Sequence, residues 1–246
     1  MKEVKEGERL DYINKGRLQI IQSPSVFSFS IDAVLLARFA SVPRTKGNII
    51  DFCSGNGIIP LVLTERSQVP ILGVEIQPLL CDMARRSVQI NKKEKQVTIK
   101  QGDIITVAKE AGSAKFDLVT CNPPYFATKG EKEYNENPHL AIARHEIYCS
   151  LEEVIHACSQ VVKQKGKVAM VHRPERLSEM ITLFEKHRIA PKRVKFIHPK
   201  KDRDANIVLL EGIKDGKPGM ACLPPLFVYD EKGSYTKEFQ NYYEGK

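Results

Sequence analysis

The stretch IIDFCSGNG (residues 49–57) indicates the fold class of this 246-residue chain. It joins an apolar strand, Ile49–Cys53, to a glycine-containing turn that leads into a predicted helix, Gly57–Arg66. Ligands of open α/β sheets bind where such strands end, and glycines let the backbone turn sharply and come close to a ligand. The stretch therefore predicts an α/β protein with a ligand site at this turn.

The same alternation of strands and helices continues toward the carboxyl terminus. Apolar runs predict six further strands, at Ile71–Val74, Val97–Lys100, Phe116–Cys121, Lys167–His172, Val194–His198 and Ala205–Glu211. Amphipathic segments predict helices at Pro78–Asn91, Ile104–Glu110, Leu151–Lys163 and Pro174–His187. Strands that alternate with helices form a parallel sheet covered on both faces. Because no helix separates the last two strands, we expect a Rossmann-like, mostly parallel seven-stranded sheet with an antiparallel last strand.

Two flanking segments extend the core, which we place at residues 48–211. Residues 1–47 form an N-terminal extension that is expected to pack on the core. Its expected elements are two short strands and a helix capped by Ser30, at Arg17–Gln22, Val26–Phe29 and Ile31–Ala40. Residues 212–246 form a C-terminal arm rich in glycine, proline and tyrosine, which we expect to pack without regular structure.

The composition is that of a basic globular protein. Hydrophobic residues make up 42% of the chain and charged residues 28%, which is enough for a sizeable core. No apolar run is long enough to span a membrane, and Met1–Glu8 lacks the apolar stretch of a signal peptide. The formal charge of +8 favours a polyanionic partner. We therefore expect a cytoplasmic protein, and we assume a monomer.

The cysteines and histidines argue against a metal site. The six cysteines form no Cys-x-x-Cys pair, and the six histidines have no cysteine or carboxylate set beside them. We therefore expect reduced thiols that mostly fill the core, and no bound metal.

Acidic residues end the second and third predicted strands. Glu75 lies about twenty residues past the glycine turn, where a carboxylate can accept hydrogen bonds from both hydroxyls of a ribose. Asp103 ends the next strand and can accept from an adenine amino group, while Asp51 can meet a cationic or amino group. Pro60 stands where a dinucleotide site needs a third small residue, so the pattern argues against a dehydrogenase. Each carboxylate alone is typical of a solvated strand end, but the ordered set is far more specific.

The segment Asn122-Pro123-Pro124-Tyr125 directly follows the strand Phe116–Cys121. Its prolines restrict the backbone, so the Asn122 side-chain oxygen and the Pro123 carbonyl are expected to point into the crevice at the sheet edge. Two acceptors at one point suit an NH2 group, and accepting both hydrogens favours a pyramidal nitrogen whose lone pair can attack a methyl group. Tyr125 offers a flat face for a planar substrate. The alternative is an ordinary Pro-Pro turn at a strand end.

Together these motifs resemble the class I S-adenosylmethionine-dependent methyltransferases, and among them the Asn-Pro-Pro-Tyr subgroup that methylates amino nitrogens. The resemblance spans residues 48–211; Phe52 and Cys53 depart from the commoner Asp-Leu-Gly-Ser-Gly form but stay apolar or small. It implies catalytic roles for Asn122, Pro123 and Tyr125. It also implies that S-adenosylmethionine is held by Asp51, Ser54, Gly55, Asn56, Gly57, Glu75, Ile76, Asp103, Ile104 and Asn122.

Four flanking motifs resemble a narrower family, the bacterial enzymes that make N6-methyladenosine beside the anticodon of a valine tRNA. These motifs are Phe27–Leu36, Ala143–Glu146, His198–Lys201 and Leu223–Leu226. The resemblance covers nearly the whole chain and implies a tRNA substrate whose unpaired target base enters the crevice at little cost. The candidates for phosphate contacts are Arg144, Lys200, Lys201 and Arg203, although these residues also fit a solvated basic face.

Three alternatives remain at this point. A protein glutamine N5-methyltransferase uses the same Asn-Pro-Pro-Tyr logic, but that class usually has a longer helical N-terminal domain than the 47 residues that precede this core. An RNA guanine N2-methyltransferase is the second alternative. The third is an inactive methyltransferase fold that only binds RNA, which the intact acidic strand ends and Asn122 argue against.

Overall fold

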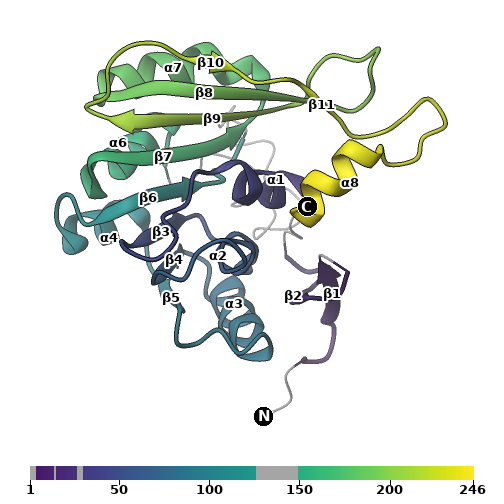
Figure 1. The fold of residues 1–246 in the computed structure, drawn as a ribbon. Helices are drawn as coiled ribbons and strands as arrows, with labels where there is room; N and C mark the ends of the chain where they lie inside the picture. Colours follow the sequence, from purple (N-terminus) through teal and green to yellow (C-terminus); the bar gives the residue numbers. More distant parts are fainter. Residues whose placement is uncertain (1–3, 14, 27–29, 126–148) are drawn as a thin grey trace, which may run out of the picture.

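A nine-stranded sheet forms the centre of the protein, and the computed structural model describes residues 4–13, 15–26, 30–125 and 149–246 (Figure 1). Seven strands make up most of this sheet: β3 (Ile49–Phe52), β4 (Ile71–Glu75), β5 (Val97–Gln101), β6 (Phe116–Cys121), β7 (Val162–His172), β8 (Ile189–His198) and β9 (Ile207–Lys214). They run in the order β8-β9-β7-β6-β3-β4-β5. Strand β9 is antiparallel to β7 and β8, whereas β3 to β7 are parallel to their neighbours among themselves. The predicted mostly parallel sheet is confirmed, and the last of its seven predicted strands, β9, is antiparallel; two further short strands raise the strand count to nine.

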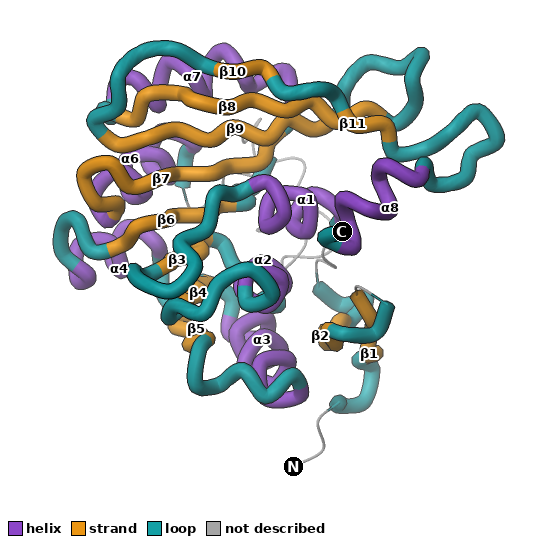
Figure 2. Tube along the Cα trace, in the orientation of Figure 1, coloured by secondary structure: helices purple, strands orange, loops and turns teal. Residues whose placement is uncertain are grey.

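Helices cover both faces of the sheet (Figures 1 and 2). One face carries α1 (Ile31–Phe39), α2 (Ile58–Leu63) and α3 (Pro78–Ile90), and the other carries α4 (Ile104–Ala111), α6 (Leu151–Val161) and α7 (Leu177–Lys186). Successive residues of a strand point to opposite faces. Ile49 accordingly joins the core under α1 to α3, while Ile50 and Phe52 join the core under α4, α6 and α7.

The N-terminal segment forms a hairpin of β1 (Arg9–Ile13) and β2 (Leu18–Gln22), which lies beside α3. Asn91, at the end of α3, fixes it, because its Oδ1 accepts from the Gln19 N–H at 2.9 Å and its Nδ2 donates to the Gln19 carbonyl at 2.6 Å. Strand β2 was predicted, whereas β1 was not. Val26 lies in no strand, and the rest of the predicted strand 26–29 lies outside the described residues.

The C-terminal arm contains regular structure, so that part of the sequence prediction is wrong. Two short strands, β10 (Ala221–Cys222) and β11 (Leu226–Phe227), pair with β8, and helix α8 (Lys237–Glu244) packs against α1. Strands of two residues have no periodicity to detect. Helix α8 had a signal that was missed: Thr236 caps it by accepting from the Phe239 N–H, and Phe239 is buried.

Several element boundaries also differ from the prediction. Helix α6 ends at Val161 rather than Lys163, and β7 begins at once, five residues before the expected start at Lys167. The strand register between β6 and β7 shifts near this point, so the early part of β7 lacks a regular alternation. Before α7, residues Pro174–Arg176 form the 3-10 helix η2 instead of a first α-helical turn. Within the described ranges, no helix is long and apolar enough to cross a membrane.

Candidate active site

The carboxyl ends of β3, β4, β5 and β6 meet at one edge of the sheet because these strands are parallel neighbours. Asp51 lies beside Thr120 in the register, Glu75 is the last residue of β4, and Asn122 directly follows β6. Asp103 follows the end of β5. The structure therefore brings the predicted acidic residues and Asn122 to the same edge.

The glycine turn after β3 is compact. Cys53, Gly55 and Gly57 have φ angles of 57°, 56° and 87°, in the left-handed region. At Gly57 a Cβ atom would lie 3.1 Å from the Cβ of Ala84 on α3, so both its backbone angle and its surroundings favour glycine. The Ser54 N–H donates to the Val74 carbonyl at 2.9 Å, which folds the turn over the end of β4.

Asp51 and Ser54 carry buried polar atoms with unused hydrogen-bonding capacity. Asp51 is fully buried, and its Oδ1 accepts a hydrogen bond from the Thr120 hydroxyl at 2.6 Å. Within the described residues, the Asp51 Oδ2 and the Ser54 Oγ have no partner. Burial raises the pKa of the Asp51 carboxyl to about 7, the nearby Thr120 and Ser54 hydroxyls oppose the rise, and the Glu75 charge adds to it. Such groups are costly unless a ligand pairs with them.

Glu75 is fixed by backbone donors on both sides. Its Oε2 accepts from the Gly55 N–H at 2.8 Å, and its Oε1 accepts from the Gln77 N–H at 3.0 Å. Burial raises the pKa of this carboxyl, and the backbone hydrogen bonds counteract the rise. A carboxylate can accept about four hydrogen bonds, so these backbone donors leave Glu75 capacity to accept from a ligand.

The other predicted cofactor residues have additional structural roles. The Asp103 carboxylate caps α4, because its Oδ2 accepts from the N–H and the hydroxyl of Thr106, each at 3.1 Å. Ile104 is buried in the core under that helix, and Ile76 is half-buried. Asn56 donates from its Nδ2 to the Ile21 carbonyl at 3.1 Å and so ties the β2 hairpin to the turn.

Asn122 and Tyr125 are linked to α1. The Tyr125 hydroxyl lies 2.8 Å from Asn122 Oδ1 and 2.7 Å from Asp32 Oδ2, within hydrogen-bonding distance of both. Asp32 is only 5% exposed. Burial raises the pKa of the Tyr125 hydroxyl well above its ordinary value, with a further contribution from Asp32, so this group stays protonated.

The end of β7 supplies two further neighbours of Tyr125. The His172 ring lies 5.1 Å from the Tyr125 ring, and the Arg173 guanidinium carbon lies 5.0 Å from the Tyr125 ring centre. Burial lowers the pKa of His172 to about 4, so the imidazole is neutral at pH 7. Its Nδ1 accepts from the Arg173 N–H at 2.8 Å, and the ring proton therefore resides on Nε2.

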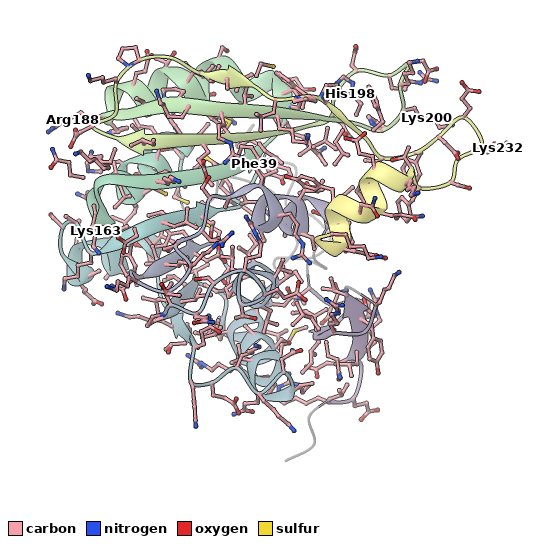
Figure 3. All side chains as sticks on the ribbon, viewed as in Figure 1. Phe39, Lys163, Arg188, His198, Lys200 and Lys232 are labelled. Atoms are coloured by element: carbon pink, nitrogen blue, oxygen red, sulfur yellow. The ribbon has the colours of Figure 1, made fainter. Side chains whose placement is uncertain are left out.

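Three of the four predicted phosphate-binding residues lie in the loop between β8 and β9. Strand β8 is oriented like β7, so its carboxyl end and this loop, with Lys200, Lys201 and Arg203, lie toward the edge that carries Asn122. Figure 3 shows His198 and Lys200 at that end of β8, opposite Lys163 and Arg188. Arg144 and Ala143–Glu146 lie outside the described residues.

Sequence reasoning missed three residues of this edge: Asp32, Thr120 and His172. Asp32 had a signal, since it is the one carboxylate in the otherwise apolar stretch Ile31–Ala37. His172 is a lone histidine at a strand end, which more often only packs. Within the described ranges, no cluster of three or more potential metal ligands is present.

The methyltransferase small-domain family model matches residues 17–197. The chain belongs to this family. Its cofactor is accordingly S-adenosylmethionine, and the Rossmann-like sheet is the fold expected for it.

Two relatives match most of this methyltransferase. A protein of Porphyromonas gingivalis named tRNA1(Val) (adenine(37)-N6)-methyltransferase is 26% identical over 210 residues, which cover 82% of this chain and 80% of the relative. A protein of the same name from Actinobacillus succinogenes is 28% identical, with 91% of each chain covered. In structure, a predicted O-methyltransferase of Agrobacterium tumefaciens matches with a TM-score of 0.69 at 20% identity, over 87% of this chain and 96% of that one. That last likeness establishes the fold alone.

Proposed function

We propose that this methyltransferase transfers the methyl group of S-adenosylmethionine to the N6 amino group of an adenine in tRNA, beside the anticodon of a valine tRNA. The observation that carries the proposal is the position of Asn122, directly after β6 and at the same edge as Asp51 and Glu75. The match to relatives named for this activity, over 82% and 91% of this chain, supports the choice of substrate. We also propose that residues 48–211 form the catalytic unit, and that 1–47 and 212–246 complete the site around it.

The unused polar capacity at the edge fits the cofactor. We assign the cationic amino group of the cofactor to Asp51 and Ser54, whose buried oxygens lack partners among the described residues. We assign the ribose hydroxyls to Glu75, whose carboxylate retains capacity to accept from a ligand. Gly55 and Gly57 let the turn approach the ligand closely. Asp103, Ile76 and Ile104 are assigned to the adenine, with Asn56 supporting the turn.

The bound cofactor supplies an electrophilic methyl group on a sulfonium. Asn122 and the Pro123 carbonyl accept hydrogen bonds from the two N–H groups of the target amino group, which favours a pyramidal nitrogen and directs its lone pair toward the methyl carbon. As the N–C bond formed, the S–C bond would break, S-adenosylhomocysteine would leave, and the methylated nitrogen would release one proton to solvent. Tyr125 orients the planar base from the side. Because the reaction depends on orientation more than on a strong base, it does not need a more basic group than His172, whose pKa is lowered to about 4 and whose ring lies beside Tyr125.

Nucleoside analysis tests the proposal directly. Transfer RNA from a strain lacking this enzyme is treated with the protein and the cofactor, digested, and examined by mass spectrometry. We expect N6-methyladenosine, located by fragment mapping beside the anticodon of a valine tRNA. N2-methylguanosine instead would keep RNA as the substrate and exclude adenine, whereas methyl incorporation into a glutamine-bearing protein and never into tRNA would exclude RNA.

Replacement of Lys200 and Lys201 by alanine is expected to weaken tRNA binding and to reduce the salt dependence of that binding. Each phosphate contact releases counterions, so losing two lowers the slope of log affinity against log salt by about one to two. Fluorescence anisotropy with labelled tRNA between low and moderate salt measures the slope. The matched control replaces Lys93 and Lys95 by alanine. These lysines precede β5 at the opposite edge of the sheet, and their replacement removes the same amount of positive charge. Equal slopes in both double variants would remove the loop from the RNA interface.

Cofactor binding is expected to weaken as the pH falls below 7. The buried Asp51 carboxyl, with its pKa raised to about 7, is largely protonated at pH 6, whereas a cationic amino group pairs with the carboxylate. Binding therefore releases a proton, and affinity falls by up to about tenfold per pH unit below the pKa. Calorimetry at pH 5.5, 6.5 and 7.5 measures this effect. Asp51→Asn is the control, because it removes the titration; a wild-type profile that matches this variant would contradict the role.

A further inference from the structure

The Tyr125 hydroxyl has too few hydrogens for the two contacts that it makes. Its hydroxyl oxygen lies 2.7 Å from Asp32 Oδ2 and 2.8 Å from Asn122 Oδ1, yet it carries one hydrogen for two acceptors. A carboxylate is the stronger, charge-assisted acceptor, so the hydrogen points to Asp32. The Tyr125 oxygen then has only lone pairs to offer Asn122, and the second contact needs a hydrogen from the Asn122 side.

We propose that Asp32 is a positioning residue that sets the direction of every hydrogen bond in the chain from Asp32 through Tyr125 to Asn122. An amide oxygen and nitrogen have nearly the same shape, and a half-turn of the Asn122 amide places Nδ2 against the Tyr125 oxygen as a donor. The same half-turn carries Oδ1 to the other side, where it can accept from the target amino group. The inference rests on the proposed function, in which Asn122 is that acceptor.

A carboxylate suits this role because it can only accept. If residue 32 donated to the Tyr125 oxygen, the phenol hydrogen would point to Asn122 Oδ1. That bond would take one of the two lone pairs of Oδ1 and hold this oxygen toward Tyr125 instead of toward the substrate. The surroundings support the arrangement: Asp32 and Tyr125 are screened from solvent, and His172 and Arg173 hold the tyrosine ring independently of its hydroxyl. The N-terminal extension thereby acts on the reaction through Tyr125.

Asp32→Asn is the discriminating substitution, since it keeps the size of the side chain but supplies hydrogens that permit the reversed chain. We expect the single-turnover rate of methyl transfer to fall about ten- to a hundredfold, the value of one misdirected charge-assisted hydrogen bond, with unchanged cofactor affinity. In a Tyr125→Phe background the same substitution should change the rate little, because the link is already cut. Equal losses in both backgrounds would overturn the proposal.

Arg38→Gln is the matched control for damage to α1. Arg38 lies on the same helix and pairs with Glu65 at 2.6 Å, so its loss perturbs the helix without touching Tyr125. It should leave the rate of methyl transfer unchanged. A rate loss equal to that of Asp32→Asn would attribute the effect to helix packing and overturn the positioning role.

NMR of the side-chain amides tests the direction of the hydrogen bonds between Asp32, Tyr125 and Asn122 without any tRNA substrate. In ¹⁵N-labelled, cofactor-saturated protein, Asn122→Ala identifies the Asn122 Nδ2 protons by their disappearance. If Nδ2 donates to Tyr125, then Tyr125→Phe and Asp32→Asn move one of these protons upfield, while Arg38→Gln does not. Unchanged chemical shifts of the Asn122 Nδ2 protons in Tyr125→Phe would overturn the proposal. A wild-type protein that methylates no tRNA but shows these shifts would contradict the proposed function and leave the hydrogen-bond direction established.

Discussion

Asn122→Ala is expected to slow methyl transfer by about 10²- to 10³-fold, the usual cost of removing one preorganised polar group from a reacting centre. The cofactor affinity and the fold should change little, because the side-chain hydrogen bond described for Asn122 is the one to Tyr125. Its acceptor contributes most when the target nitrogen becomes pyramidal, so the loss appears in the rate of the chemical step. Single-turnover experiments with excess enzyme measure that rate, and calorimetry measures cofactor binding.

Asn91→Ala is the matched control for this prediction. Asn91 joins the end of α3 to β2 through two hydrogen bonds to Gln19, so its loss should lower the melting temperature without slowing the chemistry. Single-turnover rates of Asn122→Ala that equal wild type would exclude the acceptor role. A loss of cofactor affinity as large as the loss of rate would make Asn122 a cofactor ligand instead.

The acidic strand ends could be predicted because the signals that define them are local. The apolar runs before Glu75 and Asn122 fix where each strand stops, and parallel pairing then brings their ends together. Apolar runs also identified all seven principal strands of the sheet, although not all of their first residues. Residues next to a strand end in the sequence are therefore next to the site in space.

The parts of the site and the fold that the sequence did not predict depend on contacts between distant segments. Asp32 and Tyr125 are 93 residues apart, and their pairing depends on how α1 is placed by its packing against the sheet and α2. The neutral state of His172 depends on burial that its sequence neighbours do not indicate. Strands β10 and β11 exist only because the edge of β8 offers free backbone partners, which a two-residue segment cannot reveal by itself.

Glu75→Ala is expected to weaken S-adenosylmethionine binding by roughly a hundredfold or more. Two hydroxyl-to-carboxylate hydrogen bonds of about 1.5 kcal/mol each amount to that factor. The loss of affinity can have a second cause, because Glu75 also accepts from the N–H groups of Gly55 and Gln77 and thereby supports the turn. Calorimetry with the cofactor measures the total loss, and unchanged affinity would remove Glu75 from the site.

A ribose analogue separates direct contact from support of the turn. Wild-type protein should bind 2′-deoxy-S-adenosylhomocysteine more weakly than S-adenosylhomocysteine, because a buried carboxylate oxygen loses its donor. In Glu75→Ala the two ligands should bind almost equally, since the carboxylate that distinguishes them is gone. If the variant still discriminates as strongly as wild type, Glu75 acts only by holding Gly55 and Gln77, and the ribose is bound by other groups at the carboxyl edge of the sheet.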